Sequence, residues 1–477
     1  MALLAVPLAA ALVLIRLRGD AARIVHGGAA ALTLGLGAAV AVAAAGAAPT
    51  ALDGLLRVDA LSAWMVLVVT GVGALAAVEA PRYAHDRAHV LYPLLHMMIF
   101  TMLLAVTTDD VGLMWVAVEG TTLASVFLVN FERTRASLEA SYKYLLICSV
   151  GIAIAFLGTV LVYFADLSRA AGPLAQEAHS LRWTSLRELA PLLSPRVLEL
   201  AFVFLIVGYG TKAGLAPMHT WLPDAHSEAP APVSALMSGV LLSVGIYALL
   251  RFKPIVDVAV GPDFSRRILL TLGIVSLAIA AAFLWSTRNY KRLLAYSSVE
   301  HIGLVCLGLG FGGAWGITGA ILHIANHALA KSVLFLLAGR IRAAYGTAEI
   351  ADVRGLLTAM PATGRGFLAA LLALMGLPPF GLFTSEVMIF GAGFRAGYPI
   401  TAAVGLALLV VAFGGLLRAA HSMLYGAAPA LASPAAGRAW PAAVPMGAAL
   451  LLLVLTGVAW PPGLAAALER IRMIVTP

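Results

Sequence analysis

The feature that most constrains this chain is a succession of uninterrupted apolar runs, each long enough to cross a lipid bilayer as a helix. A spanning helix needs roughly 20 apolar residues, so that 477 residues have room for on the order of 14 spans. Only 11% of the residues are charged, which is too little to cover a water-soluble domain. The runs do not alternate with period two, which excludes a transmembrane barrel. We therefore expect an all-α polytopic membrane protein.

The apolar runs also predict how the chain crosses the membrane. The predicted spans cover residues 1–16, 24–48, 58–79, 89–107, 111–131, 141–165, 197–218, 230–252, 267–286, 293–311, 315–339, 364–394, 399–425 and 441–460. An even number of spans places both ends of the chain on one side. Arginine and lysine are modestly more numerous in the loops after odd-numbered spans. The positive-inside rule therefore predicts that these loops are cytoplasmic and that both termini lie outside.

The formal net charge of +8 does not indicate a nucleic-acid partner, because the basic residues stand in short loops or singly within apolar runs. Anionic lipid headgroups are their expected partners. The two cysteines, Cys148 and Cys306, are far apart and form no CxxC motif, which argues against an iron–sulfur cluster or a disulfide framework. We expect no metal site and no cofactor in this chain, and no nucleic acid among its partners.

Two of the predicted spans are interrupted by proline. The seventh contains KAGLAPMHTWLPDA, with Pro217 and Pro223, and the twelfth contains MGLPPFGLFTSE, with Pro378 and Pro379. Proline removes a backbone donor, and the bilayer tolerates the freed carbonyls only where they face protein or water. Matching breaks five spans apart predict two inverted five-helix repeats of the transporter kind. The predicted units are 1–88 (N-terminal helices), 89–252 (first repeat), 253–425 (second repeat) and 426–477 (C-terminal helix).

Glu119 and Lys212 stand in the middle of apolar runs, where an unpaired charge costs several kcal/mol. Burial disfavours the charged form of a lysine and a neighbouring carboxylate favours it. A carboxylate that moves away would therefore make the lysine release a proton. The alternative is a buried ion pair that only fixes helix packing, although such a pair is a weak source of stability once desolvation is counted.

A second group of candidates lies in the second half of the chain. Lys331 follows His323 and His327 at steps of four, so that the three form one stripe on a helix, and Glu386 follows the second break. A proton relay is the favoured interpretation of the stripe, with side-chain packing as the alternative. Haem ligation is disfavoured, because a single helix cannot supply both axial faces from neighbouring turns.

Further candidates have ordinary explanations beside the functional one. His219 and His226 flank the end of the first break, where capping and loop hydrogen bonds explain them as well as a relay does. Lys143 stands near a helix start, from which its ammonium can reach the headgroups. Glu300 and His301 lie early in the tenth span, near the predicted cytoplasmic edge.

Several segments resemble the proton-conducting antiporter-like subunits of respiratory complex I, of Mrp-type cation/proton antiporters and of membrane-bound hydrogenases. They are GYGTKAGLAPMHTWLPDAHSEAPAPVSALMSGVLLSVGIYALLRF, NYKRLLAYSSVEHIGLV, HIANHALAKSVLFLLAGRI and LPPFGLFTSEVMIF. The resemblance covers most of residues 90–395. The segments DAHSEAPAPVSALMSGVLL and SSVEHIG are most similar to the F-type membrane protein of hydrogenase-4 and its formate hydrogenlyase relatives.

The resemblance implies roles for the residues that match. Glu119 matches the family's fifth-helix glutamate, Lys212 its seventh-helix lysine and Lys331 its central lysine. Glu386 falls where the family has a lysine or glutamate after the second break. One departure is Ser243, which stands where related M-type subunits have a lysine that links the first half-channel to the middle of the membrane. The histidines of the first break or chains of water would then have to bridge the gap.

These residues lead to a functional hypothesis. We expect a proton-translocating subunit of a multisubunit oxidoreductase of the hydrogenase-4 or formate-hydrogenlyase kind, in the plasma (inner) membrane. The resemblance implies that nickel–iron, iron–sulfur or flavin cofactors sit in a peripheral redox arm, beside other integral membrane subunits. The alternatives are an Mrp-like sodium/proton antiporter subunit, an M- or N-like complex I subunit, and a non-transporting scaffold. Sodium prefers several hard oxygen ligands, whereas the central groups here are mostly Lys and His, which favours protons.

Overall fold

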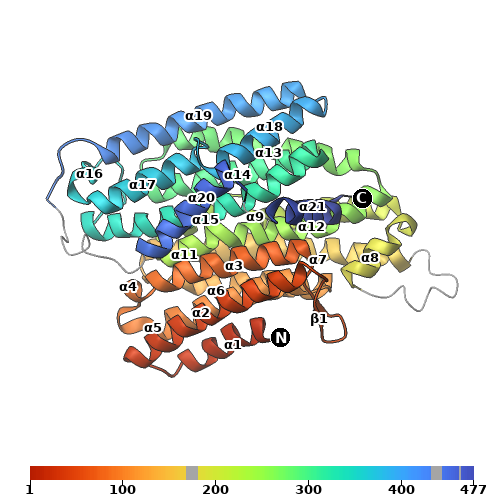
Figure 1. The fold of residues 1–477 in the computed structure, drawn as a ribbon, viewed down its shortest axis with the longest axis horizontal. Coiled ribbons are helices and arrows are strands. Elements are labelled where there is room, and N and C mark those ends of the chain that lie inside the picture. The colour runs from red at the N-terminus through yellow and green to blue at the C-terminus, as the bar shows by residue number, and fades with distance from the viewer. Residues whose placement is uncertain (168–180, 431–442, 461–462, 477) are drawn as a thin grey trace.

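Long helices run side by side through the whole molecule (Figure 1). The computed structural model describes residues 1–167, 181–430, 443–460 and 463–476. One short antiparallel hairpin, in which Thr50 pairs with Arg57, interrupts the helical pattern. The helices are apolar on nearly all sides because each faces either another helix or lipid.

The elements follow the predicted spans closely. The first part of the chain forms α1 (Ala2–Leu14), α2 (Gly19–Ala44), β1 (Thr50–Ala51), β2 (Leu56–Arg57), α3 (Ala60–Glu79), α4 (Pro81–Ala84), η1 (His85–Arg87), α5 (Ala88–Thr107), α6 (Val111–Val129) and α7 (Arg135–Leu167). The middle part forms α8 (Trp183–Leu189), η3 (Ala190–Leu192), α9 (Pro195–Ala213), α10 (Trp221–Glu228), α11 (Ala231–Leu236), η4 (Met237–Leu241) and α12 (Leu242–Ala259). The last part forms α13 (Pro262–Ser286), α14 (Tyr290–Phe311), α15 (Gly313–Tyr345), α16 (Leu356–Ala359), α17 (Pro361–Leu374), α18 (Gly381–Arg395), α19 (Pro399–Leu424), α20 (Ala443–Val458) and α21 (Leu464–Val475).

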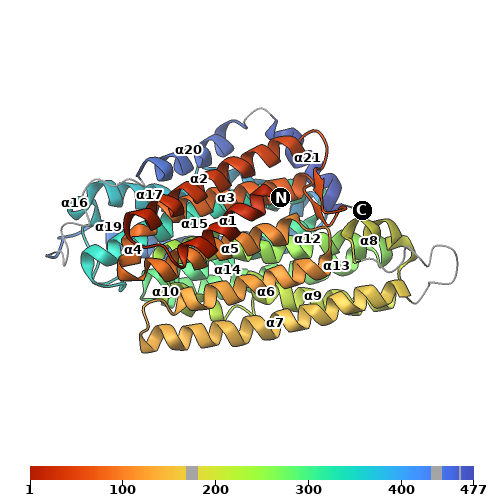
Figure 2. The ribbon, with the colours of Figure 1, turned by 90° about the horizontal axis from the view of Figure 1, so that it is seen from below.

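Within the described ranges, 10 helical segments are long and apolar enough to cross a membrane, and three shorter apolar helices accompany them. The shorter ones are α1, α17 and α20, of which α17 is the first half of the predicted twelfth span. The predicted class, an all-α polytopic membrane protein, is confirmed. The two ends of the bundle differ: one carries the β1–β2 hairpin, α8 and α21, and the other carries α4 and α16 (Figures 1 and 2). We call the first the hairpin end.

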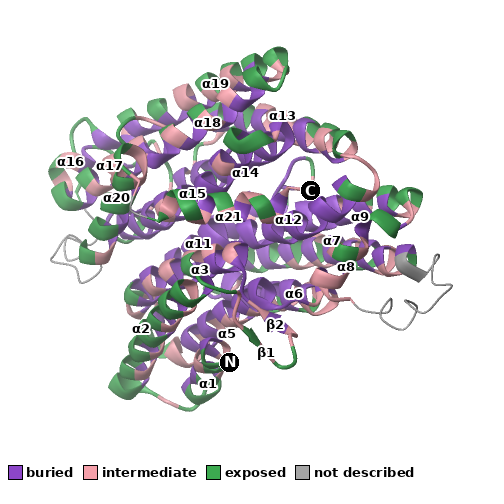
Figure 3. Ribbon diagram, turned by 45° about the vertical axis from the view of Figure 1, so that its right-hand side comes forward, coloured by how far each residue is buried: buried purple, intermediate pink, exposed green. Residues whose placement is uncertain are grey.

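Burial rises steeply toward the centre of the bundle (Figure 3). The continuous segment Ala231–Ala259 comprises α11, the π-helical η4 and α12, and its most apolar 18 residues are all buried. Peripheral helices such as α2 and α19 are mostly exposed, as lipid-facing helices are. A fully enclosed helix that still carries serines, an arginine and a lysine therefore needs internal partners for each of them.

The predicted breaks are present, and they divide the chain in matching ways. α9 ends at Gly214 with φ of 75°, and Gly376 follows α17 with φ of 64°, conformations that glycine adopts without the penalty of a Cβ atom. The packing order also recurs, since α5 pairs with α6 as α13 does with α14, and α7 contacts the helices on both sides of the first break, α9 and α10, as α15 contacts those on both sides of the second, α17 and α18. This recurrence agrees with two repeats, while the boundaries of the predicted units stay a prediction.

Several predicted boundaries lie a few residues from the observed helix ends, and the difference is largest at the end of the eighth span. The apolar run places the end of the eighth span at residue 252, which would leave the following lysine in a loop, but α12 continues to Ala259. The reason is local pairing: Arg251 forms an ion pair with Asp59, and Lys253 forms one with Asp257 on the next turn of the same helix. These buried pairs let the helix carry charge without ending.

We predict that the contact between α7 and α9 depends on Gly208. A Cβ atom added there would lie 2.5 Å from the backbone nitrogen of Ala155 and 2.5 Å from the carbonyl oxygen of Gly151. Small residues allow helices to approach this closely in membranes. Gly208→Leu should therefore lower stability by roughly 1–3 kcal/mol or more through overpacking. The measurement is the thermal unfolding midpoint of the purified protein in detergent.

Gly28→Leu is the matched control, because a Cβ atom at Gly28 on α2 meets nothing within 4 Å. Equal midpoints for the two variants would contradict the close α7–α9 contact.

Candidate functional site

The first candidate pair, Glu119 on α6 and Lys212 on α9, is joined through a hydroxyl group. Lys212 Nζ donates a hydrogen bond of 2.8 Å to Thr122 Oγ1, and Thr122 donates in turn to Glu119 Oε2 at 3.1 Å. The expected ion pair is therefore an indirect one, with Thr122 between the two charges. Such an arrangement leaves a path along which a proton can pass from one group to the other.

The rest of this first cluster completes the coordination of both charges. Lys212 also donates to the Tyr144 hydroxyl at 2.9 Å, and Ser125 is hydrogen-bonded to the same hydroxyl at 2.7 Å. On the other side, Ser149 donates to Glu119 Oε1 at 2.7 Å. The members come from three helices, so that a small shift of α7 or α9 changes the contacts of the ammonium group. The first cluster consists of Glu119, Thr122, Ser125, Tyr144, Ser149 and Lys212.

A second cluster surrounds the histidine stripe of α15. His323 Nε2 is hydrogen-bonded to His301 Nδ1 of α14 at 2.9 Å, and its Nδ1 to Ser385 Oγ of α18 at 2.8 Å. The His327 ring lies 5.1 Å from that of His301. Lys331 donates to Ser297 Oγ and to a backbone carbonyl of α14. Three helices thus bring the predicted stripe into contact with the start of α18.

Two buried carboxyl groups belong to the second cluster. Glu300 is 2% exposed and Glu386 is 6% exposed, so that both lie inside the protein and not at its edge. Glu386 lies against the second break, because a Cβ atom added at Gly376 would be 2.0 Å from its Oε2. The glycine of the break therefore makes room for the carboxyl group. The second cluster consists of Ser297, Glu300, His301, His323, His327, Lys331, Ser385 and Glu386.

Among the residues that the structure describes, the second cluster contains a group of side chains that could hold a metal ion. Ligand atoms of His301, His323 and Glu386 lie within 4.8 Å of one another, and two imidazoles with a carboxylate are a set that Zn²⁺ uses. The two imidazoles are nevertheless hydrogen-bonded directly to each other, which is the arrangement of a relay. That this chain has no metal site stays a prediction.

The α11–α12 segment lies between the two clusters. Its glycines allow close contact on both sides: a Cβ atom at Gly245 would meet the backbone of α9, and one at Gly239 would meet that of α15. Ser238, in the π-helical turn, is hydrogen-bonded at 2.8 Å to Ser298 of α14, next to Ser297 of the second cluster. Single π-turns inside helices frequently mark functional sites.

Two sequence candidates on or near this segment are buried but have free polar atoms. Over the part of the chain that the structure describes, Ser243 Oγ finds no hydrogen-bond partner, and neither do the two ring nitrogens of His226. The His226 ring stacks on Phe335 of α15 at 5.1 Å. Buried polar atoms normally have partners, so these two side chains are exceptions inside the bundle.

Two other candidates lie apart from both clusters. Lys143 is half exposed and pairs with Glu139 at 2.6 Å and Asp224 at 3.2 Å, so it belongs to a surface network at the end opposite the hairpin. His219 lies beside the Tyr296 ring, with a centroid distance of 6.3 Å. The geometry thus groups Glu119 with Lys212, and Lys331 with its histidines and Glu386. It brings neither Lys143 nor His219 into either group.

Sequence reasoning missed the hydroxyl groups that connect the charges. Thr122 and Tyr144 in the first cluster, and Ser238 and Ser298 between the clusters, carry no charge that would single them out in an apolar run. The available signal was spacing, since Thr122 follows Glu119 by three residues and shares its helix face. Lys291 was also missed: it is buried and caps the end of α10 by donating to two backbone carbonyls at 2.8 and 2.7 Å.

Comparisons with known proteins agree with this architecture. A family model described as NADH:quinone oxidoreductase/Mrp antiporter, TM, matches residues 108–412. The chain is 37% identical to the "Hydrogenase-4 component F homolog" of Methylacidiphilum infernorum (isolate V4) over 85% of both chains. It is 34% identical to "NADH-quinone oxidoreductase subunit N" of Desulforudis audaxviator (strain MP104C) over 70% of this chain and 66% of that one. A chain of respiratory complex I from Thermus thermophilus has the same fold, with a TM-score of 0.85, 22% identity, and coverage of 100% of this chain and 99% of that one.

The fold and the paired intramembrane clusters define an antiporter-like membrane subunit. The chain belongs to the NADH:quinone oxidoreductase/Mrp antiporter transmembrane family. The matched region includes both clusters and the α11–α12 segment between them, which confirms the resemblance found in the sequence.

We predict that the Thr122 hydroxyl is needed to connect Glu119 and Lys212. Thr122→Val keeps the shape of the side chain and removes the bridge. A hydrogen bond to a charged group is worth roughly 1.5–3 kcal/mol, so proton translocation by the assembled complex should slow about tenfold or more. Thr121→Val is the matched control, because the Thr121 hydroxyl donates to the Val118 carbonyl of its own helix, at 2.7 Å. Equal translocation rates for the two variants in membrane vesicles would contradict the bridge.

Proposed function

We propose that this chain is the proton-translocating membrane subunit of a multisubunit respiratory-type oxidoreductase of the hydrogenase-4 or formate-hydrogenlyase kind. The observation that carries the proposal is the pair of buried polar clusters with serines between them. Hydrocarbon surroundings make isolated ionisable groups costly, so groups that are kept there and connected by hydroxyls and imidazoles favour transport. The 37% identity to a hydrogenase-4 component F homolog supports the choice of complex.

The proposed proton path uses the groups in the order in which they lie. When Glu119 draws nearer to Lys212, the carboxylate favours the charged ammonium, and when it withdraws, desolvation favours proton release. The released proton passes through Ser238, Ser298 and water toward Lys331. The His301–His323 pair then carries it toward Glu386 at the second break, because each imidazole can accept a proton on one nitrogen and donate from the other.

The rest of the assembly supplies what moves the charges. In this proposal the electrons travel through nickel–iron, iron–sulfur or flavin groups in partner subunits of a peripheral redox arm, and this chain contributes no redox centre. The membrane is the plasma membrane, and both termini lie outside, so that the hairpin end faces outward. This orientation rests on the positive-inside rule applied to the loops at the two ends.

The surroundings of Glu119 support a neighbouring membrane subunit. Glu119 is only partly buried, and the large apolar residues around it on α6 and α7, such as Val116 and Val150, are more than half exposed. A partly exposed carboxylate at mid-membrane depth is costly against lipid, so a second integral subunit is expected to cover this face. A subunit at this face would also lie close enough to Glu119 to change the distance between its carboxylate and Lys212.

We predict that Lys331 is required for coupled translocation. Lys331→Met should abolish redox-driven proton uptake by membrane vesicles that contain the assembled complex, because an apolar side chain cannot take up or release the proton. Lys212→Met should have the same effect. Arg342→Met is the control on α15, since Arg342 is exposed at the end of the helix. Pumping that survives Lys331→Met would favour a scaffold, and sodium flux without proton flux would favour a sodium/proton antiporter subunit.

We also predict that the α6–α7 face contacts another subunit. A photo-crosslinking amino acid at Val150 should form an adduct with a second integral subunit of the purified complex. The same label in the isolated chain, which has lost its neighbours, should form none. Mass spectrometry identifies the product, and labelling of lipid alone in the intact complex would contradict the predicted contact.

A further inference from the structure

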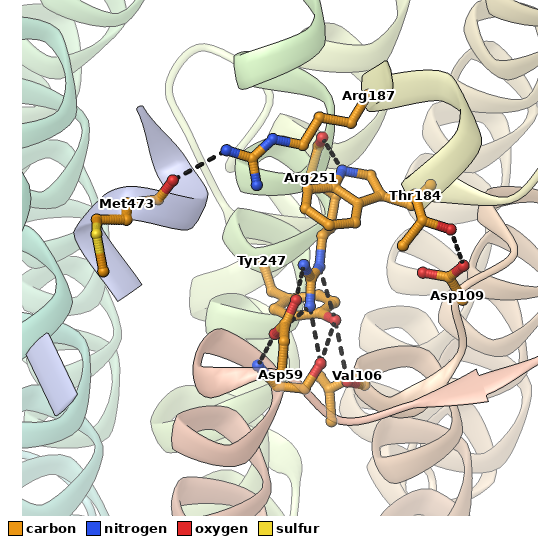
Figure 4. A network of polar contacts seen from close by, with 10 residues as sticks. Asp59, Val106, Asp109, Thr184, Arg187, Tyr247, Arg251 and Met473 are labelled. Carbon is orange, nitrogen blue, oxygen red and sulfur yellow. Dashed lines mark hydrogen bonds and ion pairs between the residues drawn. The ribbon is translucent and has the colours of Figure 1, made fainter. Parts of the chain in front are cut away.

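A column of buried polar side chains occupies one face of α12, outside both clusters. Ser243, Tyr247 and Arg251 follow one another at steps of four residues, and their exposed fractions are 0%, 1% and 5%. Ser243 stands two residues before Gly245, at which α12 contacts the backbone of α9. Arg251 lies near the hairpin end, beside α8 (Figure 4). The column therefore leads from the interior of the bundle toward the surface at the hairpin end.

Arg251 is held by contacts on every side. Its terminal nitrogens bind the two carboxylate oxygens of Asp59 at 2.6 and 2.8 Å, one of them also donates to Ser62 Oγ at 2.8 Å, and Nε donates to the Tyr247 hydroxyl at 2.9 Å. These contacts use four of its five N–H groups. The guanidinium also lies 4.5 Å from the Trp183 ring centre and 4.9 Å from that of Tyr247. The cation is fixed in one position.

The partner of this cation stays ionised. Burial on its own would raise the pKa of Asp59, but the charge of Arg251 and its hydrogen bonds outweigh burial, and the Ser62 backbone N–H adds a further donor. The pKa of Asp59 is therefore held below its usual range. The lowered pKa agrees with the bidentate geometry of the pair, in which both carboxylate oxygens of Asp59 accept from Arg251.

The column ends at the arginine as far as protons are concerned. The Tyr247 hydroxyl donates to the carbonyl oxygen of Val106 at 2.9 Å and accepts from Arg251, and it is also hydrogen-bonded to Ser62 at 3.1 Å. A backbone carbonyl cannot pass a proton on, and arginine cannot release one in a protein. A proton that reached Tyr247 from Ser243 would meet only the Val106 carbonyl, the Arg251 guanidinium and the Ser62 hydroxyl, and Ser62 Oγ already accepts a hydrogen bond from Arg251.

A small polar recess lies on the other side of Arg251, at the hairpin end. Its lining includes Arg57, Asp59, Asp109 and Asp110, and it has room for about one water molecule. Trp183 closes it from α8 by donating to the Arg251 carbonyl oxygen at 2.6 Å. Water can thus approach the guanidinium from the surface, while the buried hydroxyls of α12 lie behind it.

We propose that Arg251 is a proton barrier that separates the recess at the hairpin end from the polar groups in the middle of the membrane. The guanidinium is fixed by its ion pair with Asp59, occupies the place where a connecting water would sit, and can neither accept nor release a proton there. Pores that conduct other species use an arginine in this way to exclude protons and cations. The inference rests on the proposed function, because the barrier matters only if the interior groups carry protons.

The test is passive proton leak, measured in proteoliposomes that contain the assembled complex at rest, after a pH step outside. Arg251→Ser leaves the Asp59 carboxylate as a free proton acceptor and opens space for water. The leak should rise about tenfold or more, which corresponds to a barrier lowered by roughly 1.4 kcal/mol. Arg251→Lys keeps a cation in place and should leak much less than Arg251→Ser. Arg266→Ser is the matched control, because Arg266 pairs with the exposed Asp263 on α13 and lies outside the column.

Two further variants make the result decisive. Arg251→Gln combined with Asp59→Asn removes both charges with little change in size. This double variant should also leak, and it provides the test if the complex with Arg251→Ser does not assemble. A leak unchanged from wild type in the assembled variants would overturn the barrier. Adding Lys212→Met to Arg251→Ser should suppress the new leak. If the leak persists in the variant that carries both Arg251→Ser and Lys212→Met, Arg251 is a barrier but the proposed proton path through Lys212 is wrong. Failure of the barrier proposal and failure of the proposed path therefore give different results.

Discussion

The cost of placing charge in hydrocarbon is the constraint on which this structure depends. Each ionisable group in a spanning helix must find a partner or a wet path, because lipid offers neither. The chain meets this requirement in two different ways. Asp59 with Arg251, and Lys253 with Asp257, are closed ion pairs near the hairpin end. The charges in the two clusters are instead joined to hydroxyls, imidazoles and carbonyls, so that they are stabilised without being neutralised by direct contact.

The breaks in the two irregular spans also supply partners for buried polar groups. In a continuous helix the backbone N–H and C=O groups bond to one another, so none is free for other partners. A broken helix leaves some carbonyls and amides inside the protein without a helical partner. Gly214 and Gly376 occur at equivalent places in the two halves, close to Lys212 and Glu386 respectively. The π-helical turn of the central segment adds a third irregularity between the clusters. Irregular backbone is thus concentrated where the buried polar groups meet.

The sequence was sufficient for the class and for most of the elements, because apolar runs and proline breaks are direct consequences of bilayer thickness and backbone chemistry. It also singled out Glu119, Lys212, Lys331 and Glu386 as candidates, since charge inside an apolar run is conspicuous, and the structure places these residues in the two clusters while their role stays a prediction. The bridging role of Thr122 was not predicted, because hydroxyl residues are ordinary in membrane helices. The burial of Arg251 was missed for another reason. A basic residue near the end of an apolar run is typical of a loop, and its partner Asp59 lies 192 positions away in the sequence.

Together, the clusters and the closed pair at Arg251 describe a protein that lets protons move inside the membrane and blocks one route by which they would escape. This proposal requires that protons, and not sodium ions, cross the membrane. The most direct measurement is the pH change inside sealed vesicles that carry the purified complex during turnover with its electron donor. We expect a pH difference that a protonophore collapses and that forms without sodium. A difference that requires sodium, or none at all in a complex that still turns over, would contradict it.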